Sequence, residues 1–96
     1  MKEKIALDDV RIESLSEDLK KGFPKIEKLY IAKEHYILVD FVNKDYDIDT
    51  LLDLRSLTDK LWPDTKVEIL VKDFIDNEIL EDLMSDSVCV FDRDKK

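Results

Sequence analysis

Apolar and polar residues alternate along the chain in a way that divides it into seven predicted elements. Ile12, Leu15 and Leu19 recur at helical spacing, and Gly22 followed by Pro24 is a typical end of a helix. Segments rich in β-branched and aromatic residues indicate strands. The predicted elements are a helix over 9–21, strands over 26–32 and 35–42, a helix over 47–62, a strand over 66–71, a helix over 76–85 and a strand over 87–91.

The lengths of the connections predict how these strands pair. Only Lys33 and Glu34 separate strands 26–32 and 35–42, so we expect an antiparallel hairpin. A long helical connection leads from 35–42 to 66–71, so we expect these two strands to be parallel. The expected fold is a two-layer α+β or α/β domain with helices covering a mixed sheet, in the element order α-β-β-α-β-α-β.

Composition narrows the classes of protein to which the chain can belong. Its 96 residues are expected to form a single domain over 1–96. The 24 acidic and 16 basic residues give a net charge of −8, which disfavours nucleic acid as the main ligand. Cys89 is the only cysteine, and no apolar run is longer than the four residues of 36–39, which is too short to cross a membrane. The N-terminus does not lead into a signal-peptide core. We therefore expect a soluble, cytoplasmic protein that binds neither nucleic acid nor membrane.

Few residues have the types and spacing of a common catalytic site. The single histidine, His35, cannot build a common zinc site, and one glycine excludes a glycine-rich phosphate loop. Residues 45–49 begin like a calcium loop. That loop needs Gly at its sixth position and Glu at its twelfth, where this chain has Thr50 and Ser56. A helix start with solvated acidic neighbours is the better interpretation of this segment.

Four segments carry a resemblance to a known family. They are Ile-Leu-Val-Asp-Phe at 37–41, the helix over 51–61, Lys-Val-Glu-Ile-Leu-Val at 66–71, and the stretch over 79–91 that ends in Val-Cys-Val-Phe. With 28–31 as a first strand, they resemble the minimal nucleotidyltransferases, small members of the polymerase-β-like nucleotidyltransferase superfamily. The resemblance implies a nucleotidyltransferase-like fold.

The parts of this family that carry its chemistry are missing from the chain. Members have a Gly-Ser turn that approaches a nucleoside triphosphate and an Asp-x-Asp pair that holds metal ions. Here Ala32 leads through Lys33 into Glu34 without Gly-Ser, and the alignment puts Glu34 and Tyr36 at the Asp-x-Asp positions. Glu68 stands at the third carboxylate position. Because tyrosine is not an anionic ligand at neutral pH, the resemblance implies a catalytically inactive member without a resident metal or cofactor.

Two alternative arrangements of carboxylates would give the protein an active site. Strand alternation places Asp40 and Glu68 on the former catalytic face, where a solvated acidic face is the simpler interpretation. In the first alternative, Asp40 and Glu68 lie near each other there and hold a metal ion together with Glu34. In a rival alignment, Asp47 and Asp49 supply the Asp-x-Asp pair on a strand. Either arrangement would make the protein a metal-dependent nucleotidyltransferase using Mg²⁺ and a nucleoside triphosphate.

The resemblance also implies a partner. Minimal nucleotidyltransferases often act as antitoxins of ribonuclease toxins of the HEPN class, so a HEPN-type toxin is the expected protein partner. On the helix over 48–62, apolar residues cover more of the circumference than packing on one sheet requires. Unless neighbouring helices cover the surplus, we expect Leu52 and Trp62 to form an exposed apolar patch that mediates a homodimer or a hetero-complex.

Overall fold

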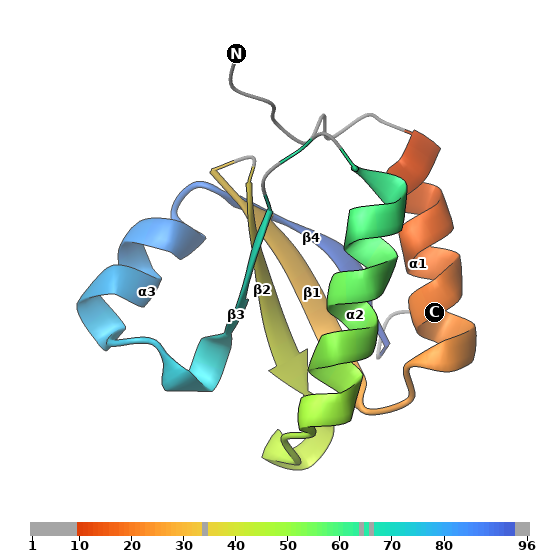
Figure 1. Cartoon of the computed structure of the whole chain (residues 1–96). Helices are drawn as coiled ribbons and strands as arrows, with labels where there is room; N and C mark the ends of the chain where they lie inside the picture. Colours follow the sequence, from red (N-terminus) through yellow and green to blue (C-terminus); the bar gives the residue numbers. More distant parts are fainter. Residues whose placement is uncertain (1–9, 34, 64, 66, 94–96) are drawn as a thin grey trace.

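The computed structural model describes residues 10–33, 35–63, 65 and 67–93, and within them it shows a small α+β domain (Figure 1). The elements are α1 (Val10–Gly22), β1 (Ile26–Ala32), β2 (Tyr36–Phe41), the 3₁₀ turn η1 (Val42–Lys44), α2 (Ile48–Leu61), β3 (Glu68–Val71), the 3₁₀ turn η2 (Lys72–Phe74), α3 (Asn77–Met84) and β4 (Ser87–Asp92). The predicted helices and strands are confirmed in type and order. Residues 9 and 66, the predicted first residues of a helix and a strand, lie outside the described residues.

The strands form one mixed sheet in the order β3-β2-β1-β4. β1 pairs with β2 in antiparallel fashion, as the short connection predicts, and β2 pairs with β3 in parallel, as the helical connection predicts. β4 lies antiparallel to β1 at the edge opposite to β3. The chain must therefore cross the sheet between β3 and β4, and α3 lies on this crossover.

One face of the sheet packs against α1 and α2, which lie side by side (Figure 1). The alternation along β2 directs Ile37, Val39 and Phe41 into this layer. The buried residues of this core are Leu15, Leu19, Ile26, Leu29, Ile31, Ile37, Val39, Phe41, Leu54, Trp62, Val71 and Phe91. Their burial is the main source of stability, because apolar burial contributes about 25 cal/mol per Å².

The opposite face of the sheet is partly covered by α3, so helices occupy both faces. Ala32, Leu38 and Leu83 form a second buried cluster, and Leu80 and Met84 of α3 pack against it. The expectation of only two layers is therefore wrong for this part of the sheet. The crossover from β3 to β4 places α3 on the second face of the sheet, where its Leu83 side chain is buried against Ala32 and Leu38.

Two arginines connect helix ends to distant parts of the chain. Arg11 on α1 donates a hydrogen bond of 3.0 Å to the carbonyl oxygen of Leu61, at the end of α2. Arg93, just after β4, donates to carbonyl oxygens near the end of α1. These bonds join the end of α2 to α1 and the end of α1 to the chain after β4. None of the helices in the described ranges is long and apolar enough to cross a membrane.

Candidate functional site

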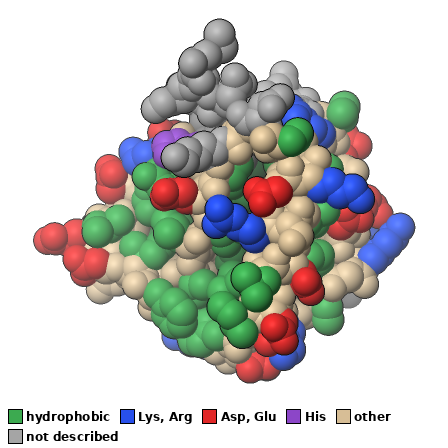
Figure 2. Space-filling model, viewed as in Figure 1, with side chains coloured by type: hydrophobic (Ala, Val, Ile, Leu, Met, Phe, Trp, Pro, Cys, Tyr) green, Lys and Arg blue, Asp and Glu red, His purple; other side chains and the backbone are tan. Residues whose placement is uncertain are grey.

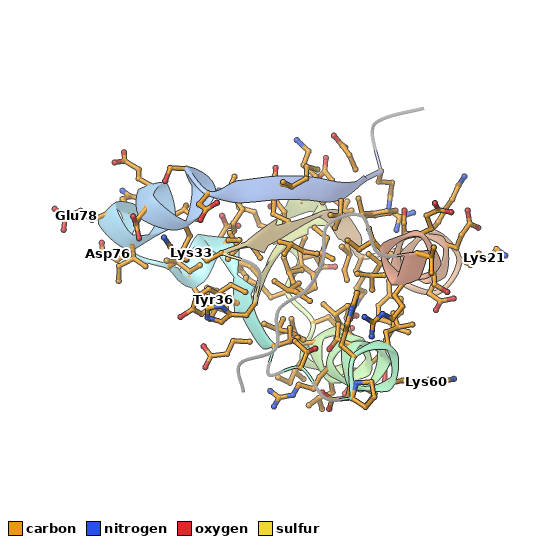
Figure 3. The ribbon with its side chains drawn as sticks, turned by 90° about the horizontal axis from the view of Figure 1, so that it is seen from above. Lys21, Lys33, Tyr36, Lys60, Asp76 and Glu78 are labelled. Carbon is orange, nitrogen blue, oxygen red and sulfur yellow. The ribbon has the colours of Figure 1, made fainter. Side chains whose placement is uncertain are left out.

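Tyr36 and Glu68 are neighbours in the parallel pairing of β2 and β3. The Tyr36 side chain packs against the buried cluster beneath α3, and its ring centroid lies 4.1 Å from that of His35. Viewed from above, Tyr36 and Lys33 lie on the side of the molecule that carries α3 (Figure 3). The structure thus brings two of the three remnant positions together, but one of them is an aromatic side chain packed against apolar groups. The third, Glu34, lies outside the described residues.

Asp40 lies at the other end of β2 and does not meet Glu68. Glu68 pairs with Tyr36, and Asp40 lies four residues after Tyr36 on β2. At the rise of a strand, this separates Asp40 from the Tyr36–Glu68 pair by about 13 Å. Asp40 instead forms an ion pair of 3.7 Å with Lys72, whose ammonium group lies 5.0 Å from the ring centroid of Tyr30. The expectation that Asp40 and Glu68 lie close together is wrong, because the parallel register separates them.

Asp47 and Asp49 lie at the start of α2, so the rival alignment, which needs a strand here, is wrong. Asp47 accepts a hydrogen bond of 2.5 Å from the Thr50 hydroxyl, and its carboxylate lies 3.7 Å from the ammonium group of Lys25. The Thr50 hydrogen bond first, and the charge of Lys25 after it, lower the pKa of Asp47. Both interactions make Asp47 part of the helix start, where a negative charge is favourable. The described residues contain no group of three His, Cys, Asp or Glu side chains arranged to hold a metal ion.

The two residues expected at a partner interface differ in their surroundings. Leu52 is 59% exposed, but Trp62 is only 1% exposed. Trp62 belongs to the core between α1 and α2, with the Arg11 guanidinium 5.4 Å from its ring centroid. The prediction of an exposed Trp62 is wrong, because α1 covers the end of α2 and takes up part of its apolar circumference.

Two aromatic residues that the sequence pattern did not single out lie beside the start of α2. Tyr46 follows η1 and Phe74 ends η2, and their ring centroids are 4.4 Å apart. The Tyr46 hydroxyl donates a hydrogen bond of 2.9 Å to Asp73. Burial and this hydrogen bond raise the pKa of Tyr46. The only sequence signal was an aromatic residue in each of two polar turns, which helix and strand periodicity does not detect.

A groove of about 620 Å³ lies elsewhere, between α1 and β4. Ser16 and Lys20 of α1 and residues 89–93 line it. None of the residues predicted for catalysis, metal binding or partner contact lies in this groove.

Comparison of the chain with protein-family models and with curated proteins gives no match. The class of protein that the structure defines is therefore a small α+β domain with a four-stranded mixed sheet and three helices within the described residues.

Proposed function

We propose that the protein is a degenerate nucleotidyltransferase-like domain that binds a protein partner and does not transfer nucleotides. The observation that carries this proposal is the placement of Tyr36. At the position where the family resemblance requires a metal-binding carboxylate, a tyrosine packs against the apolar cluster beneath α3, beside Glu68. The antiparallel β1–β2 pair and the parallel β2–β3 pair support the resemblance, which requires this arrangement.

The alternative, an active transferase with Mg²⁺ and a nucleoside triphosphate, receives no support from the carboxylates in the described residues. The donor set does not fit a metal site, because Asp40 is paired with Lys72 and is separated from Glu68 by four residues of strand. Asp47 is engaged by Thr50 and Lys25 at a helix start.

The partner in this proposal is a HEPN-type toxin of the cytoplasm. An acidic domain of net charge −8 is complementary to the basic surface that an RNA-cleaving protein needs. The exposed side chain of Leu52 on α2 supplies an apolar contact away from the former catalytic face. In this proposal, complex formation alone neutralises the toxin.

The test has two parts, one for each half of the proposal. Incubation with labelled nucleoside triphosphates, Mg²⁺ or Mn²⁺, and RNA and protein acceptors is expected to give no transfer. Transfer that disappears in a Glu68→Gln variant overturns the inactive assignment.

For the second half, the protein is co-purified with a HEPN-type protein encoded beside it. We expect a stable complex with suppressed ribonuclease activity, and Leu52→Glu should weaken it about tenfold or more. Ile79→Glu, at an exposed apolar residue on α3, is the matched control and should have no effect. The absence of a complex, or equal effects of both variants, contradicts the proposed partner or the proposed contact.

A further inference from the structure

An apolar patch lies at the carboxyl ends of the parallel strands β2 and β3. It consists of Tyr46, Ile48, Leu52 and Phe74, and we call it the carboxyl-edge patch. Phe74 is 67% exposed and Ile48 is 66% exposed, and Ile48 and Leu52 are one helical turn apart on α2. Figure 2 shows hydrophobic side chains gathered over η2 and the start of α2. Large exposed apolar side chains gathered in one place indicate an interaction surface.

The two turns that carry the aromatic residues of the patch are fixed to each other. The Tyr46 hydroxyl donates to Asp73, and the Tyr46 ring contacts both Phe74 and Phe41, with centroids 4.4 and 5.8 Å apart. Lys72, in the second turn, is paired with Asp40 at the end of β2. A partner that binds here meets a preformed surface, so it does not have to order these turns.

The surroundings of the patch are strongly acidic. Residues 40–53 and 72–78 contain eight Asp or Glu and only two Lys or Arg, which accounts for most of the net charge of −8. The exposed carboxylates include Asp45, Asp49 and Asp76. This charge selects against several occupants. A second copy of the chain would bring an identical acidic ring against this one, and nucleic acids and anionic membranes would also be repelled.

We propose that the carboxyl-edge patch binds a basic amphipathic segment of a partner protein. The apolar residues of that segment cover Ile48, Leu52 and Phe74, and its Lys and Arg side chains meet the surrounding carboxylates. A helix with apolar residues at i, i+3, i+4 and i+7 has the shape for such a contact. The inference rests on the binding half of the proposed function, and it adds the surface and the chemistry of the partner segment.

The probe is a fluorescently labelled helical peptide with leucine along one face and lysine elsewhere. Its binding to the full chain is measured by anisotropy at low and high salt, and the contact surface is mapped by NMR chemical shifts. We expect saturable binding that weakens with salt, with shifts at residues 46–52 and 73–75. A scrambled peptide of the same composition, without an apolar face, should bind about tenfold more weakly or worse.

The variants test the surface itself. Phe74→Ser and Ile48→Ser should each weaken the amphipathic peptide about tenfold, whereas Ile79→Ser and Val88→Ser, at exposed apolar residues outside the patch, should not. Asp45→Asn with Asp49→Asn should reduce the salt dependence. Equal binding of both peptides, equal loss in patch and control variants, no binding of either peptide, or self-association through the patch in sedimentation overturns the inference.

The outcome for this patch is separable from the outcome for the proposed function. If a HEPN-type complex forms but Phe74→Ser and Ile48→Ser leave it unchanged, the patch inference fails and the proposed function stands. If nucleotide transfer is found while the peptide still binds at residues 46–52, the proposed function fails and the patch inference stands.

Discussion

Arg93 donates a hydrogen bond of 2.7 Å to the carbonyl oxygen of Phe23, which lies seventy residues earlier in the chain. The same guanidinium donates to Leu19 and Ile26 at 3.1 and 2.9 Å. These three carbonyls belong to the last turn of α1, the loop after it and the first residue of β1. The Leu19 and Phe23 carbonyls also accept hydrogen bonds from the backbone N–H groups of Phe23 and Ile26, both at 3.1 Å. The Arg93 side chain therefore adds a further hydrogen bond to each of these carbonyls and connects the end of α1 to β4.

We expect Arg93→Ala to lower the free energy of unfolding by about 2–3 kcal/mol, because hydrogen bonds from a charged donor are each worth about 1.5–3 kcal/mol and are not additive. Arg93→Lys should recover only part of this loss, because an ammonium group cannot reproduce the planar arrangement of donors. Urea unfolding followed by circular dichroism measures both. Lys60→Ala, at an exposed site on α2, is the control and should change stability by less than about 0.5 kcal/mol. An Arg93→Ala variant as stable as this control contradicts the interpretation.

Trp62 gives a second test, since its indole N–H is buried and has no hydrogen-bond partner among the residues that the structure describes. We expect Trp62→Phe to cost less than about 1.5 kcal/mol, because phenylalanine keeps an aromatic ring in the core and removes the unsatisfied donor. Trp62→Ala should cost about 3–5 kcal/mol, because it leaves a cavity between α1 and α2. Unfolding is followed by far-ultraviolet circular dichroism, because both variants lose the only tryptophan. Equal losses in the two variants would show that ring packing is unimportant at this site.

The burial of Trp62 is a feature that the sequence did not predict. The period of α2, its acidic start and Pro63 after it are local signals, and the length of the helical connection predicts the parallel pairing of β2 and β3. Which part of the apolar circumference of α2 is exposed depends on α1, whose Arg11 reaches Leu61 fifty residues away. Local patterns carry no information on such a contact.

In the candidate site, too, some features follow from local signals in the sequence and others depend on contacts between distant segments. Tyr36 and Glu68 lie side by side because β2 and β3 pair in parallel with this register. The length of the connection predicted the parallel pairing. The contact between Tyr46 and Phe74 did not follow, because two turns without periodicity meet only when the ends of β2 and β3 lie side by side. The covering of the second face by α3 also depends on the position of β4 at the far edge of the sheet.

Lys44 adopts a left-handed backbone conformation, with φ of 55°, directly after Asn43 at 54°. This conformation costs a residue with a Cβ atom about 1–2 kcal/mol, and glycine avoids that cost but loses about 0.5–1 kcal/mol of chain entropy. We expect Lys44→Gly to raise the free energy of unfolding by up to about 1 kcal/mol in urea titrations. Lys60→Gly, in the last turn of α2, should lower it by up to about 1 kcal/mol. Destabilisation by both substitutions would contradict the left-handed conformation at Lys44.

The carboxylate of Asp47 makes stability depend on pH at the start of α2. The hydrogen bond from Thr50 and, after it, the charge of Lys25 lower its pKa below the ordinary value of 3.8. A carboxyl group with a lowered pKa in the folded state contributes stability that is fully present above 3.8 and is lost as the pH falls through the folded value. Thr50→Val should raise the pKa of Asp47 towards 3.8 and flatten this part of the stability curve.

Carboxyl-carbon NMR titration measures the pKa of Asp47, and urea unfolding at neutral pH and below 3.8 measures the stability. Lys25→Met removes the more distant charge, 3.7 Å away, and keeps the hydrogen bond from Thr50, so it should raise the pKa less than Thr50→Val does. Which of the two variants raises the pKa of Asp47 more shows whether the hydrogen bond or the ion pair is the main cause of the lowered pKa. A larger rise in Lys25→Met would show that the ion pair, rather than the hydrogen bond, holds Asp47 in its ionised form at the start of α2.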